Sequence, residues 1–375
     1  MRPFLSPSQP LARIDLAALA HNYSEVRRLV GRSVSILAMV KADAYGHGSF
    51  EVAGALSRQG CTTFGVATLA EARAIRLALP DARVVVFGGL CPDDAQAAVA
   101  SGVEIVVSDI DVVMACGAAA AAAGTELAVH VKIDTGMRRL GVEPRDAVDF
   151  VKRIRSTRGT RPAALCSHFA LAESVTTEVT DGQVELLQEA ARAVAERGPA
   201  LPCHLANSAG ILTRPASHLD MVRPGLMLYG LYPDTSLAGH ASLRPVMTLE
   251  GGVVRVAGVG PGEGIGYGHT FRTERPTRVA TLRCGYADGY PRALSNRGVA
   301  LLGDRRVPVL GRVCMDHVMV DVTELDDGDV EVGTRMILWG PGLDAGEVAA
   351  LADTISYELV ARVGRRVDRV YEEAS

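Results

Sequence analysis

The sequence predicts an α/β fold, in which an N-terminal (β/α)8 TIM barrel precedes a smaller, mostly-β C-terminal domain. Strand and helix patterns alternate regularly between residues 13 and 245. After Pro245, helical periodicity gives way to short Val-rich and Gly-rich strands that are separated by turn signals. At 375 residues, 48% hydrophobic and 22% charged, the chain has the composition of a globular protein and the length of two domains.

The barrel is predicted from a series of short apolar runs. Asp15 can cap a first helix, Leu16–Val30, whose apolar residues recur at helical spacing. The predicted strands are Val34–Val40, Thr63–Ala67, Val84–Phe87, Ile105–Val107, Leu127–Ile133, Ala164–His168, Cys203–Ala206 and Met221–Leu228. The predicted helices between most of them are Phe50–Gln59, Leu69–Leu79, Pro92–Ala100, Asp111–Ala123, Pro144–Arg153 and Gly182–Glu196. Eight strands interleaved with helices are what a TIM barrel requires.

Two alternatives stand beside this interpretation. A doubly wound sheet would usually show a Gly-x-Gly-x-x-Gly phosphate loop after its first strand, and the sequence has none there. The alanine run Ala118–Ala123 predicts helix, with a flexible low-complexity segment as the alternative.

The second domain is predicted to span residues 246–375. Its candidate strands are Gly251–Val259, Val279–Leu282, Ala300–Leu302, Val307–Leu310, Val318–Val322 and Met336–Trp339, with one helix at Glu347–Ser356. Residues 1–12 lie outside the barrel pattern, and we expect them to join this domain.

Charge and cysteine usage exclude several classes of function. A net charge of -4, with both signs mixed, gives no electrostatic footprint for nucleic acid or for a membrane surface. The seven cysteines form no Cys-x-x-Cys pair, which argues against a disulfide framework and against a structural zinc site. The sequence shows no secretory signal and no apolar run near the roughly 20 residues of a membrane helix, so we predict a cytoplasmic protein without a metal.

Polar residues and glycines follow the predicted barrel strands. In order along the chain they are Lys41, Thr68, Gly88, Gly89, Ser108, Asp134, Thr135, Gly136, His168, Asn207, Ser208 and Arg223. Catalytic groups of TIM barrels gather where the strands end, at the C-terminal face. The pattern is therefore consistent with a cofactor-binding cup at this face.

Lys41 is the most informative of these residues. It stands where a buried strand leaves the core, and partial burial disfavours the ammonium form and makes the amine available as a nucleophile or base. Residues 40–48 read Val-Lys-Ala-Asp-Ala-Tyr-Gly-His-Gly, which closely resembles the lysine motif of the alanine racemase family, enzymes that use pyridoxal 5'-phosphate (PLP). Further motifs occur in that family's order over nearly the whole chain.

The resemblance implies a set of cofactor-binding residues. Lys41 would carry PLP and act as the base on one face of the substrate. The residues that match the family's phosphate site are Tyr45, Ser208 and Tyr357, with the backbone N–H groups of Gly225 and Leu226; Asn207 belongs to the same Asn-Ser-Ala motif. Arg223 matches the arginine that faces the pyridine nitrogen. Because arginine keeps its proton, the nitrogen stays unprotonated, which favours racemisation over transamination.

A second base is implied by the segment Gly264–Gly268, in which Tyr267 matches the family's opposing catalytic tyrosine. In the family this tyrosine comes from the partner subunit, so the resemblance implies a homodimer. With a reference pKa of roughly 10, tyrosine needs cationic or hydrogen-bonding neighbours to act as a base. His168, Arg223 and His204 match a hydrogen-bonded chain that leads from it.

Substrate-binding residues are implied by three further motifs. The Asp-Thr-Gly-Met motif places Arg139 near the substrate carboxylate and Lys132 where some family members carry a carbamylated lysine. The later segments Gly285–Tyr290 and Arg312–Asp316 supply Tyr286, Met315 and Asp316. Tyr286, together with Tyr357, resembles the residues that narrow the entrance, the Met315 N–H would receive the substrate carboxylate, and Asp316 would have a supporting role.

The resemblance therefore implies a PLP-dependent isomerase that interconverts L- and D-alanine with two bases and supplies D-alanine for peptidoglycan synthesis. Alternatives are a racemase of broader or serine-type specificity and a non-catalytic PLP-binding barrel protein. Pocket shape decides between small substrates, since a methylene is worth only about 1–3 kcal/mol. The cysteine-bearing C-terminal signature of related amino-acid decarboxylases is not seen.

Overall fold

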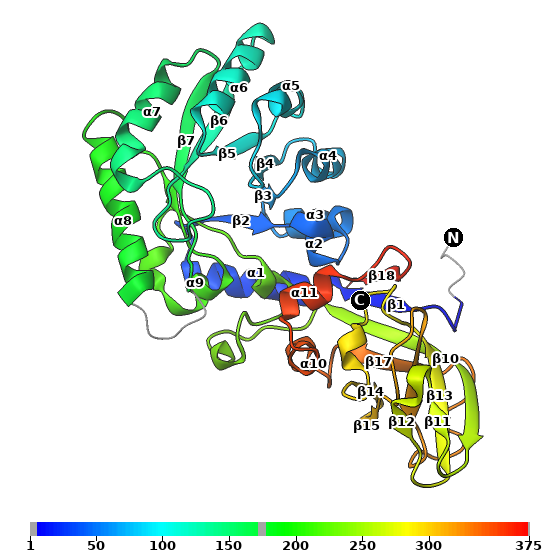
Figure 1. Ribbon diagram of the computed structural model, residues 1–375. Helices are drawn as coiled ribbons and strands as arrows, with labels where there is room; N and C mark the ends of the chain where they lie inside the picture. The colour runs from blue at the N-terminus through cyan, green and yellow to red at the C-terminus, as the bar shows by residue number, and fades with distance from the viewer. Residues whose placement is uncertain (1–5, 172–177, 374–375) are drawn as a thin grey trace.

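The computed structural model describes residues 6–171 and 178–373, and it consists of a closed barrel beside a sheet domain (Figure 1). The barrel strands are β2 (Ser35–Met39), β3 (Thr63–Val66), β4 (Arg83–Val86), β5 (Glu104–Val107), β6 (Leu127–Lys132), β7 (Thr160–Cys166), β8 (Cys203–His204) and β9 (Met221–Val222). Each strand is parallel to the next, and β9 closes the barrel against β2. The predicted TIM barrel is confirmed.

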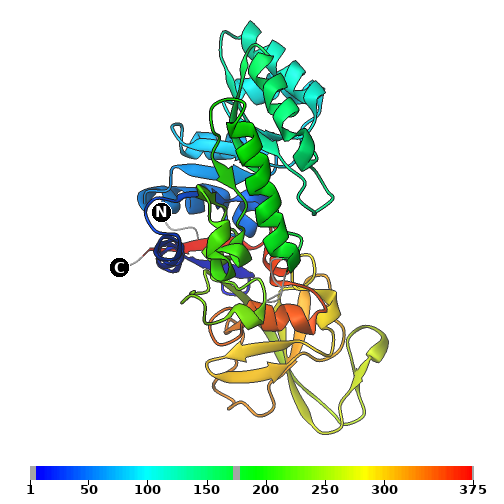
Figure 2. The ribbon, with the colours of Figure 1, turned by 90° about the vertical axis from the view of Figure 1, so that its left-hand side faces the viewer.

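Helices surround the barrel and bury their apolar faces against it. They are α1 (Leu16–Val30), α3 (Ser49–Arg58), α4 (Leu69–Ala78), α5 (Ala95–Ala100), α6 (Ile110–Ala122), α7 (Ala147–Ser156) and α8 (Glu178–Ala195). Asp15 caps α1 as predicted, because its carboxylate accepts a hydrogen bond from the Ala18 N–H at 2.8 Å. Residues Ala118–Ala122 of the alanine run form the end of α6 and are helical, and Ala123 is the C-cap. Figure 2 shows α8 running along the side of the barrel.

Several predicted elements are wrong in part. The helices predicted at Pro92–Ala100 and Pro144–Arg153 begin with 3-10 turns, and the strand predicted at Val307–Leu310 runs from Arg305 to Pro308. The predicted strand Met221–Leu228 ends at Val222, and Leu226–Tyr229 forms a 3-10 turn, η4. Pro224 cannot donate to a strand ladder, and the apolar run had signalled burial rather than extended backbone. The predicted helix Glu347–Ser356 is two helices, α10 (Ala345–Leu351) and α11 (Ser356–Ala361), because the chain turns at Asp353, whose φ is 55°.

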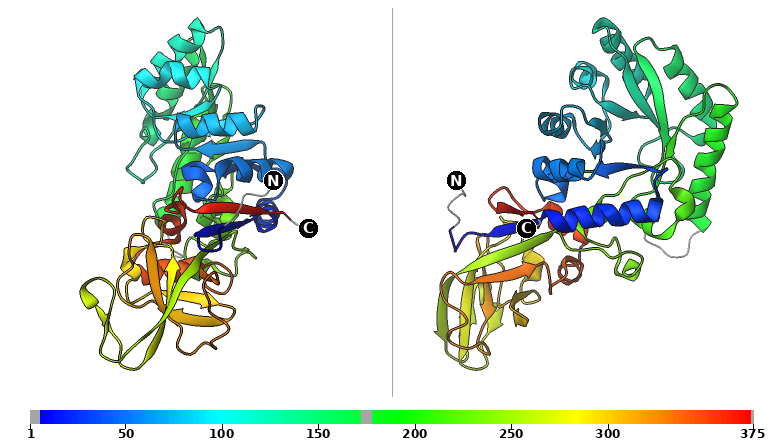
Figure 3. Two further views of the ribbon diagram at one scale, coloured as in Figure 1. Left: turned by 90° about the vertical axis from the view of Figure 1, so that its right-hand side faces the viewer. Right: turned by 180° about the vertical axis from the view of Figure 1, so that it is seen from behind.

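The sheet domain joins both ends of the described chain. Its strands are β1 (Leu11–Asp15), β10 (Met247–Val259), β13 (Thr277–Arg283), β14 (Val299–Leu302), β15 (Arg305–Pro308), β16 (His317–Asp321), β17 (Arg335–Trp339) and β18 (Asp368–Glu372). Strand β1 pairs antiparallel with β10 and parallel with β18, which brings the two ends side by side (Figures 1 and 3). Residues 1–5 of the segment predicted to join this domain lie outside the described residues.

A small hairpin of β11 (Gly264–Ile265) and β12 (Phe271–Arg272) lies on the sheet domain, with Tyr267–His269 forming a 3-10 turn, η6, at its tip. Figure 1 shows it on the part of that domain that faces away from the barrel. Within residues 6–171 and 178–373, no helix is both long enough and apolar enough to span a membrane.

Candidate active site

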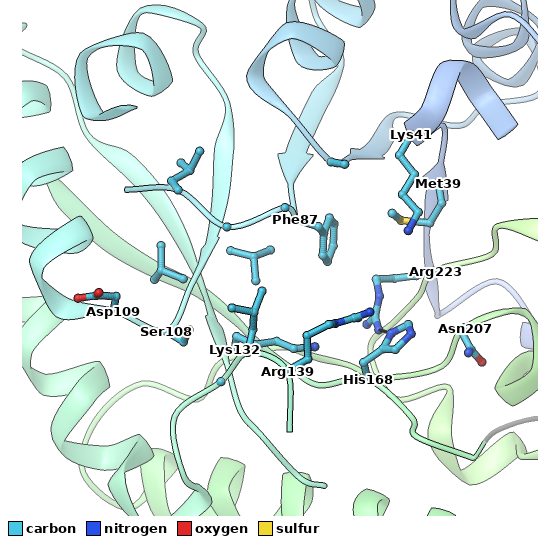
Figure 4. Close-up of a pocket in the computed structure, with 18 of the residues that line it drawn as sticks. Met39, Lys41, Phe87, Ser108, Asp109, Lys132, Arg139, His168, Asn207 and Arg223 are labelled. Carbon is cyan, nitrogen blue, oxygen red and sulfur yellow. Dashed lines mark hydrogen bonds between the residues drawn. The ribbon is translucent and has the colours of Figure 1, made fainter. Parts of the chain in front are cut away.

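A cavity of about 1180 Å³ opens at the C-terminal mouth of the barrel (Figure 4). The sequence-predicted residues that line it are Lys41, Tyr45, Lys132, Arg139, His168, Asn207, Ser208, Arg223, Gly225, Leu226 and Tyr357. Figure 4 shows the side chains of Lys41, Arg139 and Arg223 reaching into a common space. The fold thus brings residues from opposite sides of the barrel, far apart in sequence, to one place.

Lys41 is aimed into the cavity by an uncommon backbone turn. The segment α2 (Lys41–Tyr45) is a left-handed turn, since Ala42 to Tyr45 have φ angles of 52–54°. Each L-residue in this conformation costs roughly 1–2 kcal/mol. The Glu71 carboxylate holds the turn by accepting a hydrogen bond from the Ala42 N–H at 2.8 Å. At the other end of the turn, His47 Nδ1 lies 3.0 Å from the Ala44 oxygen and 2.9 Å from the Tyr45 oxygen. These contacts hold that end of the turn in place.

The surroundings of Lys41 favour its free amine. Burial lowers its pKa, and the nearby cations of Arg139 and Arg223 lower the pKa further, against an opposing effect of Glu71. A lysine with a lowered pKa has more neutral amine at neutral pH, which is the reactive form. The geometry therefore suits covalent bonding to a carbonyl group.

Hydroxyl and backbone groups form a cradle beside Lys41. The Ser208 hydroxyl accepts hydrogen bonds from the N–H groups of Gly225 at 3.0 Å and Met227 at 3.2 Å. A Cβ atom at Gly225 would lie 2.6 Å from the Tyr45 hydroxyl oxygen, so only glycine allows this approach. The Asn207 side chain caps α9 (Ser208–Thr213) by accepting from the N–H of its third residue at 3.0 Å. Because the Ser208 hydroxyl accepts both bonds, its own O–H can donate to another group, and a hydroxyl donor of this kind suits a phosphate.

Arg223 lies at the floor of the cavity and is 4% exposed. One guanidinium nitrogen, Nη1, donates to His204 Nδ1 at 2.8 Å, and Nη2 lies 3.2 Å from His168 Nδ1. Burial lowers the pKa of Arg223 to about 10, which leaves the guanidinium charged at neutral pH. Burial and then the charge of Arg223 lower the pKa of both histidines well below the ordinary value, so both rings are neutral. The predicted grouping of His168, Arg223 and His204 is present as direct contacts.

Lys132 is the last residue of β6, and Arg139 lies in the loop that follows; both line the cavity. Burial lowers the pKa of Lys132 to about 8. The loop after β6 is shaped by Asp134, whose carboxylate accepts hydrogen bonds from the N–H groups of Gly136 at 2.9 Å and Arg138 at 3.1 Å. Arg138 turns outward to pair with Glu143 at 2.8 Å, which leaves Arg139 as the arginine that lines the cavity.

The remaining predicted residues lie elsewhere in this chain. Tyr267, Tyr286 and Met315 are on the sheet domain, outside the cavity lining, and are exposed by 69%, 43% and 51%. Asp316 is bound to Arg366 at 2.5 Å. The cavity at the barrel mouth is therefore not lined by all of the predicted site residues of its own chain.

Two residues that support the site, Glu71 and His130, were missed by the sequence analysis. Glu71 supports the lysine turn, and the signal for it was a capping box, in which Thr68 accepts from the Glu71 N–H at 3.2 Å. His130 lies two residues before Lys132 on β6, on the same face of the strand, and its Nε2 contacts Glu104 at 2.7 Å.

Comparisons with known proteins agree along the whole chain. Residues 14–233 match the family model described as alanine racemase, N-terminal domain, and residues 246–371 match the one for its C-terminal domain. The curated alanine racemase of Halothermothrix orenii is 39% identical over 366 residues, which cover 96% of each chain. A Pseudomonas aeruginosa protein described as alanine racemase, biosynthetic, is 38% identical and covers 99% of each chain.

Solved structures give the same result. The alanine racemase of Clostridium difficile 630 superposes with a TM-score of 0.93 at 32% identity, covering 99% of this chain and 97% of the other. The Bartonella henselae alanine racemase, solved with covalently bound pyridoxal phosphate, has a TM-score of 0.88 at 29% identity and covers 98% of this chain and 100% of the other. This chain belongs to the alanine racemase family.

Proposed function

We propose that this protein is a PLP-dependent alanine racemase, an isomerase that interconverts L- and D-alanine. The observation that carries the proposal is the position of Lys41, an amine with a lowered pKa that shares one cavity with the Tyr45 and Ser208 hydroxyls and with the buried Arg223. PLP needs an amine for its aldehyde and neutral donors for its phosphate, and these groups supply both. The relatives described above carry the same activity in their names.

Different residues of the cavity would bind different parts of PLP. Lys41 would bind its aldehyde carbon covalently, and Arg223 would meet its ring nitrogen. The phosphate would be held by Tyr45, Ser208, Tyr357 and the N–H groups of Gly225 and Leu226, with Asn207 and His168 completing the lining. When bound, PLP withdraws electrons from the substrate and makes its Cα–H bond acidic.

Racemisation needs a proton removed from one face of Cα and another delivered to the opposite face. We assign these steps to Lys41 Nζ on one face and Tyr267 Oη on the other. In each direction one group takes the proton from Cα while the other donates its own proton to the opposite face of Cα. Arg139 and the Met315 N–H would orient the substrate carboxylate. The lowered pKa of Lys132 favours the neutral amine that carbon dioxide modifies, so we expect a carbamate there to orient Arg139.

The proposal requires a homodimer. Tyr267, Tyr286 and Met315 are exposed on the sheet domain, outside the cavity of their own chain. We therefore propose that these residues complete the cavity of a second copy. We also propose that the enzyme works in the cytoplasm and supplies D-alanine for peptidoglycan.

The test is the loss of optical activity of L-alanine in the presence of the purified, PLP-loaded protein. Lys41→Ala and Tyr267→Phe should both lose most turnover, but only Lys41→Ala should lose the visible absorption of covalently bound cofactor. Lys152→Ala, at an exposed position of α7, and Tyr232→Phe, away from the cavity, are matched controls that should keep both properties. Full turnover of both enantiomers by Tyr267→Phe would rule out the two-base assignment. Parallel assays with L-serine decide the breadth of specificity.

A further inference from the structure

A line of buried polar side chains runs from Arg223 through the inside of the barrel. Arg223 Nη1 donates to His204 Nδ1 at 2.8 Å, and His204 Nε2 lies 2.9 Å from His130 Nδ1. His130 Nε2 then lies 2.7 Å from a carboxylate oxygen of Glu104. Both histidine rings are at most 1% exposed. The inside of a TIM barrel is usually filled by branched apolar side chains, so this line calls for a function.

The line connects the two ends of the barrel. Arg223 follows β9 at the mouth and His204 ends β8, whereas Glu104 is the first residue of β5, at the opposite end. There the Glu104 carboxylate also accepts hydrogen bonds from Arg83, the first residue of β4, at 2.8 and 3.0 Å. The hydrogen bonds from His130 and Arg83 outweigh the effect of burial and lower the pKa of Glu104 to about 2, so it is ionised.

The two ends of the line fix the direction of every hydrogen bond in it. A guanidinium only donates and an ionised carboxylate only accepts. His204 Nδ1 must therefore be an acceptor, which places the ring proton on Nε2, from where it is donated to His130 Nδ1. The proton of His130 is likewise on Nε2 and is donated to Glu104. Each ring is held in one tautomer, and all of its polar atoms are satisfied.

We propose that His130 and Glu104 are positioning residues for the reaction. They hold His204 in the Nε2–H tautomer, so that its Nδ1 lone pair always faces Arg223 and keeps the guanidinium at the floor of the cavity. In the other tautomer His204 would set an N–H against Arg223 Nη1. The guanidinium would then lose this bond and shift about the bonds that Nη2 donates to the backbone oxygens of Ser167 at 2.7 Å and Leu205 at 3.0 Å. The inference rests on the proposed function in one respect, namely that Arg223 serves the bound cofactor.

The direct test is nitrogen NMR of the purified, PLP-loaded protein labelled with ¹⁵N-histidine, without substrate. The signals of His204 and His130 should be those of neutral rings protonated at Nε2. A ring proton on Nδ1 of His204 in the wild-type protein would overturn the proposal. Because this measurement needs no turnover, it is separate from the proposed function, whose failure would appear as absent racemisation with these signals intact.

Two substitutions at one position connect the tautomer to the reaction. Glu104→Gln keeps an oxygen that accepts from His130 and should preserve the tautomers and nearly all of kcat. Glu104→Leu removes the acceptor, so it should give mixed tautomers at His204 and a fall in kcat on the order of tenfold, with little change in KM. Tenfold is the lower end of the loss seen when the hydrogen-bond partner behind a metal-ligating histidine is removed. Unchanged ring signals and kcat in a folded Glu104→Leu protein would overturn the proposal. If that variant does not fold, the wild-type signals decide the question alone.

Discussion

The chain contains only three lysines, Lys41, Lys132 and Lys152, and the first two line the cavity at the barrel mouth. Every other residue of the lysine-and-arginine group is an arginine. This usage suggests that lysine is kept for positions where an amine is needed. Burial moves the pKa of a lysine toward neutrality, whereas an arginine stays charged. The same cavity shows both cases, because Lys132 has a pKa of about 8 while Arg223 remains a cation at about 10.

The lowered pKa of Lys132 predicts a pH-dependent stability. Between pH 8 and its unperturbed value of 10.5, the unfolded chain binds a proton at Lys132 that the folded protein does not. The wild-type protein should therefore gain stability as pH rises through this window, relative to Lys132→Met. Urea unfolding from pH 7 to 10.5, in buffer purged of carbon dioxide, measures the difference. A constant difference between the two proteins across that range would show that Lys132 is not perturbed.

At the scale of single elements, the left-handed turn after β2 is the clearest case of local strain placed at the site. Ala42 to Tyr45 occupy a region that glycine adopts without penalty, yet only Gly46 and Gly48 beside them are glycines. The turn is held by a hydrogen bond from the Ala42 N–H to the Glu71 carboxylate and by the contact of His47 Nδ1 with the Ala44 oxygen. The turn directs the Lys41 side chain into the cavity and places the Tyr45 hydroxyl beside Gly225.

Relief of this strain should stabilise the protein. Ala42 is exposed, so Ala42→Gly loses little packing and should raise the free energy of unfolding by about 0.5–1 kcal/mol, after allowance for the greater freedom of glycine in the unfolded chain. The matched control is Ala20→Gly in the right-handed helix α1, which should lower it by about 1 kcal/mol. Urea denaturation measures both. Equal destabilisation by the two substitutions would contradict the argument.

At the scale of the whole molecule, the barrel and the sheet domain carry different parts of one proposed site. Each barrel mouth holds Lys41, while the hairpin with Tyr267 lies on the sheet domain of the same chain, exposed and away from that mouth (Figure 1). A dimer in which two copies exchange these parts would contain two composite sites.

Mixed dimers should test this exchange. When inactive Lys41→Ala and Tyr267→Phe proteins are unfolded together and refolded in equal amounts, random pairing makes half of the dimers hybrids, each with one intact site. Activity should therefore return to about a quarter of the wild-type value. Refolding each variant by itself is the control and should restore none. No recovery in a mixture shown to contain hybrids would mean that Lys41 and Tyr267 act within one chain.

The sequence by itself determined the order of elements in the barrel, because alternating apolar runs and helical periodicity depend only on local burial. It also singled out Lys41, Ser208 and Arg223, because each follows a strand that must end at the same face of the barrel. It did not predict that the run after Val222 leaves the strand, because an apolar run signals burial and not backbone shape.

Only the tertiary structure decided which distant side chains meet. His130 and Glu104 are ordinary strand residues in the sequence, and their alignment with His204 depends on the register of separate strands. The position of Tyr267 away from its own barrel mouth likewise follows from the packing of the sheet domain. Local patterns record what each segment buries, whereas contacts across the barrel arise only when all the strands close around one core.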